Sequence, residues 1–209
     1  MEFDVQLTND GKVVVIHDYE LQRTTSGQGM VKDFKLQELK LFDAGSWFDS
    51  RFARLSIPTL DEVLARYSAG NTIFNIELKT EKSEKQTLEK EVIKVIDAHN
   101  IAERVIISSF DHDSLVTCRQ LNPGIRTGML YIMDIEEPWK LALSLGCYSV
   151  HPLFSYLESA EMRNSFKKHK LALFPWTVNN PEVMADMINH QVQGIITDYP
   201  QELKKIITD

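Results

Sequence analysis

Three carboxylates in this sequence have the spacing expected of a site for a hard cation. Glu2 and Asp4 stand two residues apart in a short apolar run, and Glu77 lies near the end of another, Ile73–Leu78. Side chains two residues apart share one face of a strand. If the two strands are neighbours, three negative charges meet and need a cation among them. Carboxylate oxygens suit Ca²⁺ or Mg²⁺, so we expect one such ion at Glu2, Asp4 and Glu77.

Two further residues extend this site toward phosphate chemistry. Lys79 follows Glu77 at the same spacing and offers a positive charge to a phosphate oxygen. His17 can donate a proton near neutral pH. A cation, a lysine and a histidine around one anionic pocket suggest cleavage of a phosphodiester. Each residue alone also has an ordinary interpretation, as a solvated strand end, a structural histidine or a surface lysine. Glu77 is the exception, because a charge within an apolar run needs a partner.

The elements that must position these residues alternate along the chain. Short apolar runs are separated by stretches of helical period, which indicates crossover connections and a parallel sheet. The expected strands are Phe3–Val5, Ile73–Leu78, Val105–Ile107, Thr127–Leu130, Tyr148–Val150, Leu171–Phe174 and Gly194–Ile196. The expected helices are Leu60–Tyr67, Glu84–His99, Asp113–Leu121, Pro138–Leu145, Glu158–His169 and Pro181–Asn189. Periodicity alone fits either a closed barrel or an open doubly wound sheet.

One segment interrupts this alternation. Asn9–Lys12, with Asp-Gly at its centre, separates Phe3–Leu7 from Val13–Ile16 and predicts a β-hairpin. The returning strand should bring His17 and its neighbour Asp18 close to the carboxylates. The stretch up to Pro58 predicts an irregular excursion with a short helix at 36–41. Such a long connection is usually a lid or a binding loop.

Composition bounds the class of protein. The 209 residues are 43% hydrophobic and 25% charged, with a net charge of −7, which is typical of a globular domain. Because Lys and Arg form no cluster or stripe, we expect no nucleic-acid partner. No apolar stretch is long enough to span a bilayer, and we expect a cytoplasmic location. Cys118 and Cys147 have no metal-type spacing and are expected to be buried.

Several motifs, taken in order, resemble the glycerophosphodiester phosphodiesterase family over nearly the whole chain. Each motif alone is weak, but their order and spacing together are very specific. They are Glu2-Phe3-Asp4-Val5 with Asp10-Gly11, His17-Asp18 with Arg23-Thr24-Thr25, Asp43-Ala44-Gly45-Ser46-Trp47-Phe48, Ile57-Pro58-Thr59-Leu60, Asn75-Ile76-Glu77-Leu78-Lys79, Ser108-Ser109-Phe110, Trp176-Thr177-Val178-Asn179 and Gly194-Ile195-Ile196-Thr197-Asp198-Tyr199-Pro200.

The resemblance implies a (β/α)₈ TIM barrel that hydrolyses glycerophosphodiesters to an alcohol and glycerol 3-phosphate. In that family a divalent cation is held by the residues that match Glu2, Asp4 and Glu77. The residue that matches His17 is one of two catalytic histidines, and we assign it as the general acid for the leaving alcohol. Lys79 would neutralise the phosphate. Two residues at later strand ends are candidates for contact with substrate, Trp176 as part of the pocket lining and His151 as a polar contact.

The resemblance also implies a first barrel strand ending in His-Arg-Gly, followed by a helix, and neither is present in this sequence. We therefore expect a single domain over residues 1–209. It would be a TIM barrel lacking its first strand and helix, with the hairpin and a small insertion at about 19–58 after the second barrel strand. Exposed edges would favour self-association across the gap. Without the other histidine and an arginine, the shortened chain should be a poor catalyst or an inactive one.

Two alternative functions remain open at this point. One is a related barrel phospholipase, of the phosphatidylinositol-specific phospholipase C or sphingomyelinase D type, with a similar set of carboxylates and histidines. The other is a barrel that keeps the fold but performs no catalysis. Arg23-Thr24-Thr25 and residues 43–48 favour the glycerophosphodiesterase over the first alternative, and retention of His17, Glu77 and Lys79 argues against the second.

Overall fold

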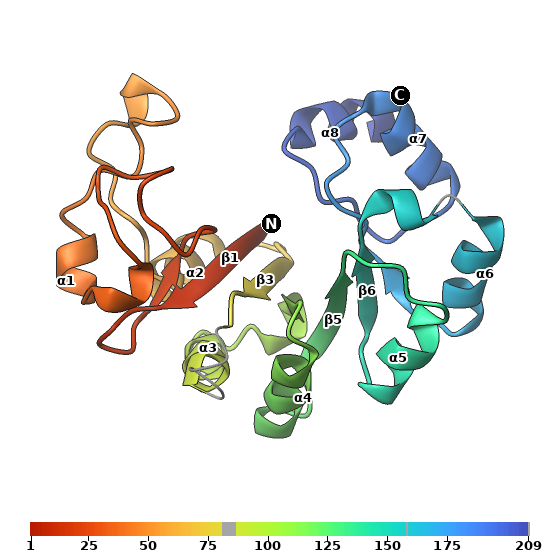
Figure 1. The fold of residues 1–209 in the computed structure, drawn as a ribbon. Coiled ribbons are helices and arrows are strands. Elements are labelled where there is room, and N and C mark those ends of the chain that lie inside the picture. Colours follow the sequence, from red (N-terminus) through yellow and green to blue (C-terminus); the bar gives the residue numbers. More distant parts are fainter. Residues whose placement is uncertain (81–86, 158, 209) are drawn as a thin grey trace. The chain divides into compact units, whose positions relative to one another are not determined.

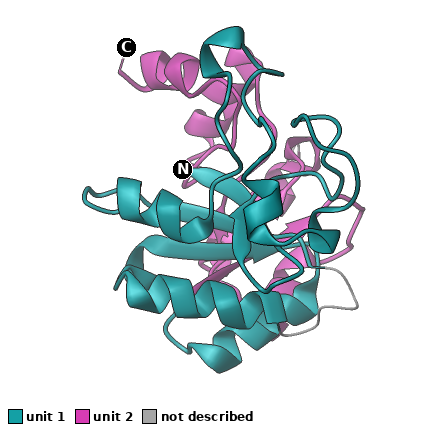
Figure 2. Ribbon diagram, turned by 90° about the vertical axis from the view of Figure 1, so that its left-hand side faces the viewer, with its two compact units in different colours: residues 1–125 teal, residues 126–209 magenta. Residues whose placement is uncertain are grey.

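The computed structural model describes residues 1–80, 87–157 and 159–208. The chain divides into two compact units, residues 1–125 and residues 126–209 (Figure 2). Each unit is built around parallel strands that alternate with helices (Figure 1). The alternation expected from the sequence is therefore present in both.

The first unit holds strands in the order β2-β1-β3-β4. β1 (Glu2–Leu7) pairs antiparallel with β2 (Val13–Val15) and parallel with β3 (Phe74–Leu78), which in turn pairs parallel with β4 (Val105–Ser109). Its helices are α1 (Leu36–Leu39), α2 (Leu60–Tyr67), α3 (Thr87–Ala98) and α4 (His112–Leu121), with short 3-10 turns at Val31–Asp33, Ser50–Phe52 and Ala102–Arg104. The predicted hairpin is thus confirmed.

The second unit holds β5 (Arg126–Tyr131), β6 (Ser149–Pro152) and β7 (Ala172–Leu173), which pair parallel in that order. Its helices are α5 (Pro138–Ser144), α6 (Ala160–Lys168), α7 (Pro181–Asn189) and α8 (Pro200–Thr208), with a 3-10 turn at Phe154–Leu157. α5 and α6 provide the crossovers between successive strands. Parallel neighbours require such connections, because a tight turn cannot return the chain to the same edge.

Helix starts are set by side chains that the sequence makes recognisable. Thr59 caps α2, accepting from the N–H of Glu62 at 3.1 Å, while Glu62 accepts from the N–H of Thr59 at 2.8 Å. Asn180 caps α7 through the N–H of Glu182, and Pro181 occupies the first helical position. Each cap contributes about 1 kcal/mol by satisfying donors that the helix leaves unpaired. The predicted limits of α2 and α7 are accordingly correct.

The main core of the first unit lies between its sheet and helices α2 to α4. Alternate residues of β3 enter this core, which Leu64 of α2 and Val92 and Ile96 of α3 fill from the helical side. The positions between them on β3 carry Asn75 and Glu77, so one face of the strand is reserved for polar groups. One face of β3 therefore packs in the core, and the other face carries the polar side chains.

The connection between β2 and α2 is compact despite its irregular backbone. Leu21, Val31, Leu39 and Ile57 are fully or almost fully buried and form a second apolar cluster beneath it. Asp43 closes the segment 43–54 by accepting from the N–H groups of three residues, Gly45, Ser46 and Arg54, at 2.8 to 2.9 Å. The large side chains of this segment, Trp47, Phe48 and Phe52, remain exposed.

One strand expected from the sequence needs correction, and one helix was not expected. Gly194–Ile196 is not a strand, although Ile196 donates to the carbonyl of Pro175 at 3.0 Å. The facing segment contains Pro175, which has no N–H, so a continuous ladder cannot form there. The helix α8 was not anticipated, because Pro200 was assigned only to a strand-end motif. The expected helix start at Glu84 and the residue Glu158 lie outside the described residues.

Two further findings concern the cysteines and the membrane. Cys118 and Cys147 are both buried, as predicted. Within the described residues, none of the helices is both long and apolar enough to cross a bilayer.

Gly128 on β5 should be intolerant of any side chain. A Cβ added there would lie 2.3 Å from Nε2 of His151 and 2.8 Å from Oγ of Ser149, and His151 is fully buried and has no room to move. We expect Gly128→Ala to lower the free energy of unfolding by about 1–3 kcal/mol, measured by denaturant titration. Gly70→Ala is the control, since its Cβ would meet nothing within 4 Å. Equal stability of the two variants would contradict the packing described.

Asp43 should hold its loop in a pH-dependent manner. Its hydrogen bonds, led by the one from the N–H of Arg54, keep the pKa of this carboxyl well below its usual 3.8. A depressed pKa stabilises the fold above about pH 4, and that contribution is lost as the pH falls through the folded-state pKa. Asp43→Ala should raise amide hydrogen exchange at Gly45, Ser46 and Arg54 at pH 7.

The control is Asp49→Ala in the same loop, which removes hydrogen bonds to Arg51 alone. It should raise exchange near Arg51 and leave Gly45 protected. Unchanged protection of Gly45 and Ser46 in Asp43→Ala would show that the loop is held by other contacts.

Candidate active site

The register between β1 and β3 brings the predicted carboxylates together. Asp4 lies directly opposite Glu77 in the parallel pair, and Glu2 lies opposite Asn75. One oxygen from each of Glu2, Asp4 and Glu77 falls within 4.8 Å of the others. Backbone pairing alone, without any long side-chain reach, therefore creates an acidic cluster on one face of the sheet.

Lys79 contributes the positive charge of this cluster. Its Nζ lies 2.6 Å from Oε1 of Glu77 and 3.1 Å from Oδ1 of Asp4, and all three side chains are at most 15% exposed. Lys79 follows the end of β3, where its N–H donates to the carbonyl of Val5 and so keeps it aligned with β1. One ammonium thus contacts two of the three carboxylates.

The excess of negative charge shifts the proton equilibria of the cluster. Burial, reinforced by Asp4 and then Glu77, raises the pKa of Glu2 to about 8. Burial and Asp4 also raise the pKa of Glu77, although Lys79 and His17 act in the opposite direction. Burial alone would lower the pKa of Lys79, but Asp4 and Glu77 outweigh it and raise the pKa. All three pKa values are thus raised, by burial first at the two glutamates and by the neighbouring carboxylates at Lys79.

The donor atoms of Glu2, Asp4 and Glu77 are of the kind that binds a divalent cation. The three ligands are hard oxygens, and when all three are ionised their charge of −3 exceeds the +1 of Lys79. A cation of charge +2 would balance that deficit and reverse the pKa shifts. Ca²⁺ and Mg²⁺ both accept carboxylate ligands of this type.

The hairpin delivers His17 to this face through a buried side chain that the sequence analysis did not single out. Gln6, only 4% exposed, donates from Nε2 to the carbonyls of Ile16, His17 and Asp18 at 3.1, 3.1 and 2.7 Å. The N–H of Ile16 also donates to the carbonyl of Asp4 at 3.1 Å. His17 is consequently fixed beside the carboxylate strand while its ring stays exposed.

A second pair of residues, Asp18 and Arg23, sets the orientation of the His17 ring. Nδ1 of His17 lies 2.6 Å from Oδ1 of Asp18, and Arg23 donates to both oxygens of that carboxylate. The Arg23 guanidinium holds the pKa of Asp18 well below its usual range, so Asp18 is ionised and can only accept. Nδ1 must therefore donate, and Nε2 is the nitrogen left to exchange a proton.

From the sequence, Asp18 and Arg23 are motif residues without an assigned role. The signal was present, because a carboxylate next to a catalytic histidine commonly fixes its tautomer. Gln6 could not have been found in this way. Nothing in a strand sequence shows that an amide will turn back to bind the carbonyls of the following loop.

A cavity of about 760 Å³ opens beside the cluster in the first unit. Its lining includes Glu2, Asp4, His17 and Arg23, the charged residues Glu62 and Arg66 of α2, and several apolar side chains from the irregular connection. Among these are Trp47, whose Nε1 donates to the carbonyl of Ala44 at 3.0 Å, and Leu55. The expected role of this connection as a binding loop stays a prediction, but its apolar residues do line the same cavity as the cluster.

The remaining predicted site residues, His151 and Trp176, belong to the second unit. The ring of His151 is completely buried, with Nε2 2.9 Å from Oγ of Ser149 and the ring of Phe174 packed against it. Burial lowers the pKa of His151 to about 3, so the ring is neutral. Trp176 is partly buried and donates from Nε1 to the carbonyl of His151 at 2.8 Å. Contact of either residue with substrate stays a prediction, and the burial of His151 favours a structural role.

Comparison with known proteins supplies the context for this geometry. Residues 1–202 match the glycerophosphoryl diester phosphodiesterase family. A glycerophosphodiester phosphodiesterase from Caldanaerobacter subterraneus is 44% identical over 207 residues, which span 99% of this chain and 85% of the relative. One from Bacillus altitudinis is 34% identical over 208 residues, covering 99% of this chain and 85% of that protein.

Solved structures agree with the sequence matches. An Oleispira antarctica phosphodiesterase, determined in complex with the product sn-glycerol-3-phosphate, superposes with a TM-score of 0.94 at 28% identity and covers 100% of this chain and 84% of that one. A glycerophosphodiester phosphodiesterase from Thermotoga maritima gives a TM-score of 0.70 at 28% identity, covering 99% and 83% of the two chains.

These matches define a phosphoric diester hydrolase with a TIM-barrel-like α/β fold. The chain belongs to the glycerophosphodiester phosphodiesterase family. The resemblance noted in the sequence is thereby confirmed, and the family is generally dependent on a divalent metal.

Cation binding should depend on Glu77. We expect Ca²⁺ or Mg²⁺ to bind with one ion per chain, and Glu77→Gln to weaken that binding by about tenfold or more, because the variant loses one of three negative charges at the site. Isothermal titration calorimetry measures both quantities. Glu89→Gln is the matched control, since Glu89 is a buried glutamate bonded to Ser114 at 2.6 Å and lies outside the cluster. Equal affinity of the Glu77→Gln and wild-type chains for both ions would exclude this ligand set.

Proposed function

We propose that the acidic cluster of the first unit carries out the hydrolysis of glycerophosphodiesters to an alcohol and glycerol 3-phosphate. The observation that carries this assignment is the convergence, within 4.8 Å, of Glu2 and Asp4 on β1 with Glu77 on β3, next to the ammonium of Lys79. Family membership supplies the reaction, and the cluster is where its residues would act.

Glu2, Asp4 and Glu77 would hold one cation, Ca²⁺ or Mg²⁺, which would polarise the phosphoryl oxygens when bound. Lys79 would offer its Nζ to a phosphate oxygen. Asp4 and Glu77 now share that ammonium, and a cation bound to these carboxylates would take over part of their charge and leave Lys79 available to the substrate. The lysine and the cation would then neutralise the same phosphate from one face of the sheet.

His17 is proposed as the general acid. Hydrolysis joins the oxygen of water to phosphorus and breaks the bond from phosphorus to the alcohol oxygen. The water gives up one proton to solvent, and the alcohol oxygen takes one proton. Protonated His17 can donate it from Nε2, because Nδ1 is committed to Asp18. Asp18, anchored by Arg23, stabilises the protonated ring before the transfer and keeps its orientation afterwards.

Trp176 and His151 remain proposed contacts of the substrate, the first in the pocket lining and the second as a polar group. Trp176 has its indole N–H committed to a backbone carbonyl, so its ring face is the part able to meet a ligand. The sequence relatives favour a glycerophosphodiester over the substrates of related phospholipases. A location in the cytoplasm stays a prediction.

The function is tested by incubating the purified chain with glycerophosphocholine and either Ca²⁺, Mg²⁺ or a chelator. Glycerol 3-phosphate is followed with a coupled dehydrogenase. Product that forms with a divalent cation and not with the chelator supports the proposal. A panel that adds phosphatidylinositol and sphingomyelin separates the alternatives, and turnover of these lipids without turnover of glycerophosphocholine would overturn the assignment.

Replacement of His17 should affect substrates according to their leaving group. In a version of this chain that also carries a family-like first strand and helix, His17→Ala should lower turnover of glycerophosphocholine by roughly 10²–10⁴-fold, because its alcohol leaves only when protonated. The loss should be much smaller for a nitrophenyl ester, whose leaving group needs no proton. His99→Ala, which removes a ring bonded to Asp61 instead, is the control. An equal loss on both substrates would mean that His17 only positions the phosphate.

A further inference from the structure

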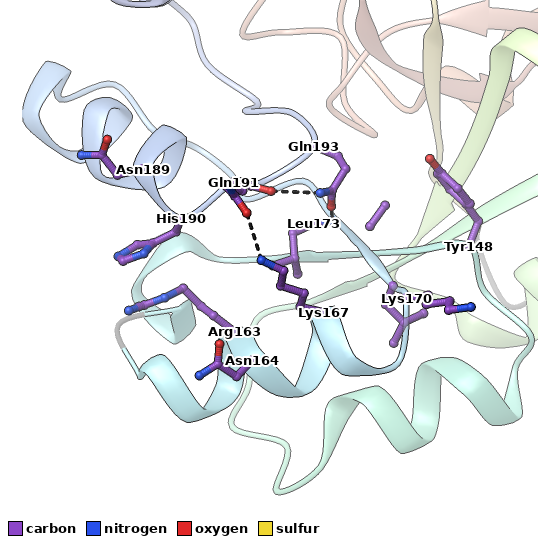
Figure 3. Close-up of a pocket in the computed structure, with 12 residues that line it drawn as sticks. Tyr148, Arg163, Asn164, Lys167, Lys170, Leu173, Asn189, His190, Gln191 and Gln193 are labelled. Atoms are coloured by element: carbon purple, nitrogen blue, oxygen red, sulfur yellow. Dashed lines mark hydrogen bonds between the residues drawn. The ribbon is translucent and has the colours of Figure 1, made fainter.

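The second unit has a basic cavity at the amino ends of its strands, whereas Trp176 comes after the carboxyl end of β7. It encloses about 470 Å³ between the C-terminal parts of α6 and α7 and the amino ends of β6 and β7 (Figure 3). Arg163, Lys167 and Lys170 line it, and no Asp or Glu is found among its described lining residues. A local charge of +3 is unusual on a chain whose net charge is −7.

The two lysines of this cavity are not used to hold the fold together by ion pairs. Within the described residues, neither Lys167 nor Lys170 lies within 4.0 Å of a carboxylate oxygen, whereas many other lysines of the chain have such partners. A lysine near the C-terminus of a helix could simply face the negative end of the helix dipole. The geometry of Lys167 differs, because its Nζ reaches away from α6 to Oε1 of Gln191 at 2.9 Å.

A network of neutral amides positions that ammonium without cancelling its charge. Gln191, which follows α7 with a φ of 59°, accepts from Lys167 through its side chain and from Nε2 of Gln193 through its backbone carbonyl at 2.9 Å (Figure 3). Gln193 in turn accepts from the N–H of Leu173 on β7 at 2.8 Å. The wall of the cavity is thereby tied to the sheet, and the lysine keeps its full charge for a ligand.

The rim adds groups suited to a larger anion. Tyr148, just before β6, is 38% exposed and lines the cavity, and the guanidinium of Arg126 lies 5.1 Å from the centre of its ring. Arg163 is anchored through Nη1 to the carbonyl of Leu157, which fixes its position on α6. His190 also lines the cavity, and its Nε2 contacts Asp186, a carboxylate on α7 that is not part of the lining.

We propose that this cavity, lined by Arg163, Lys167 and Lys170, binds a small molecule that carries two or more phosphate groups. Cations from α6 and from the turn that follows it can each meet a different phosphate, and the surrounding Asn and Gln amides can donate further hydrogen bonds. Active sites of parallel barrels lie at the carboxyl ends of their strands. This cavity lies at the amino ends and is therefore a binding site rather than a catalytic one.

The test is calorimetric titration of the whole chain with inorganic pyrophosphate at low salt. A chelator is present, so that no divalent cation can attract the anion to Glu2, Asp4 and Glu77. Wild type should bind one pyrophosphate saturably, more tightly than inorganic phosphate. Lys167→Glu and Lys170→Glu should each weaken binding by about tenfold or more, since each replaces an attraction by a repulsion.

Lys168→Glu is the matched control, because Lys168 has the same charge and helix but does not line the cavity. It should bind within twofold of wild type. Lys167→Met and Lys170→Met remove the charges without adding new ones, and circular dichroism checks that all variants fold. Titration with ADP shows whether the ligand is a nucleotide. If it is, ADP should bind more tightly than pyrophosphate, and Tyr148→Ala should remove that difference in affinity. Equal affinities of ADP and pyrophosphate would indicate that only the phosphates are recognised. No saturable binding, or an equal loss in Lys168→Glu, would overturn the proposal.

Discussion

The alignment of β1 with β3 is the constraint on which the acidic site depends. Asp4 faces Glu77 because the two strands pair in parallel at that register, and a shift of one residue would turn the carboxylates into the apolar core. The register is fixed by packing rather than by the charges, since Phe74, Ile76 and Leu78 fill the core from the intervening positions. Hydrophobic burial thus holds together a cluster whose own electrostatics oppose its formation.

The hairpin places the titratable ring of His17 beside that cluster. His17 follows the second strand of the hairpin, where the backbone would otherwise be free to leave the sheet. Gln6 binds three successive carbonyls of this segment, and Asp18 with Arg23 orients the ring. The backbone beside the ring and its Nδ1 are therefore both held, which leaves Nε2 as the nitrogen that can exchange a proton.

Much of this arrangement could be read from the sequence. The apolar runs and caps gave most strands and helices, because Thr59 or Asn180 acts over a few residues, and same-face spacing grouped Glu2 with Asp4 and Glu77 with Lys79. Neither periodicity nor spacing predicts structural features that depend on contacts between residues far apart in the sequence. The bonds from Gln6 and the burial of His151 are set by tertiary packing, and the irregular backbone at 194–196 follows from a proline in the facing segment.

The segment closed by Asp43 behaves as a self-contained module. Its ends are joined by hydrogen bonds to a single carboxylate, and Gly45 lies so close to the carbonyl of Phe52 that any side chain there would collide with it. Asp43 and Gly45 hold the loop in its conformation, while the rings of Trp47 and Phe48 are exposed. Exposed positions of this kind can accept substitutions at small cost to folding. Related enzymes could therefore diversify the apolar wall of their substrate cavity while the acidic cluster remained unchanged.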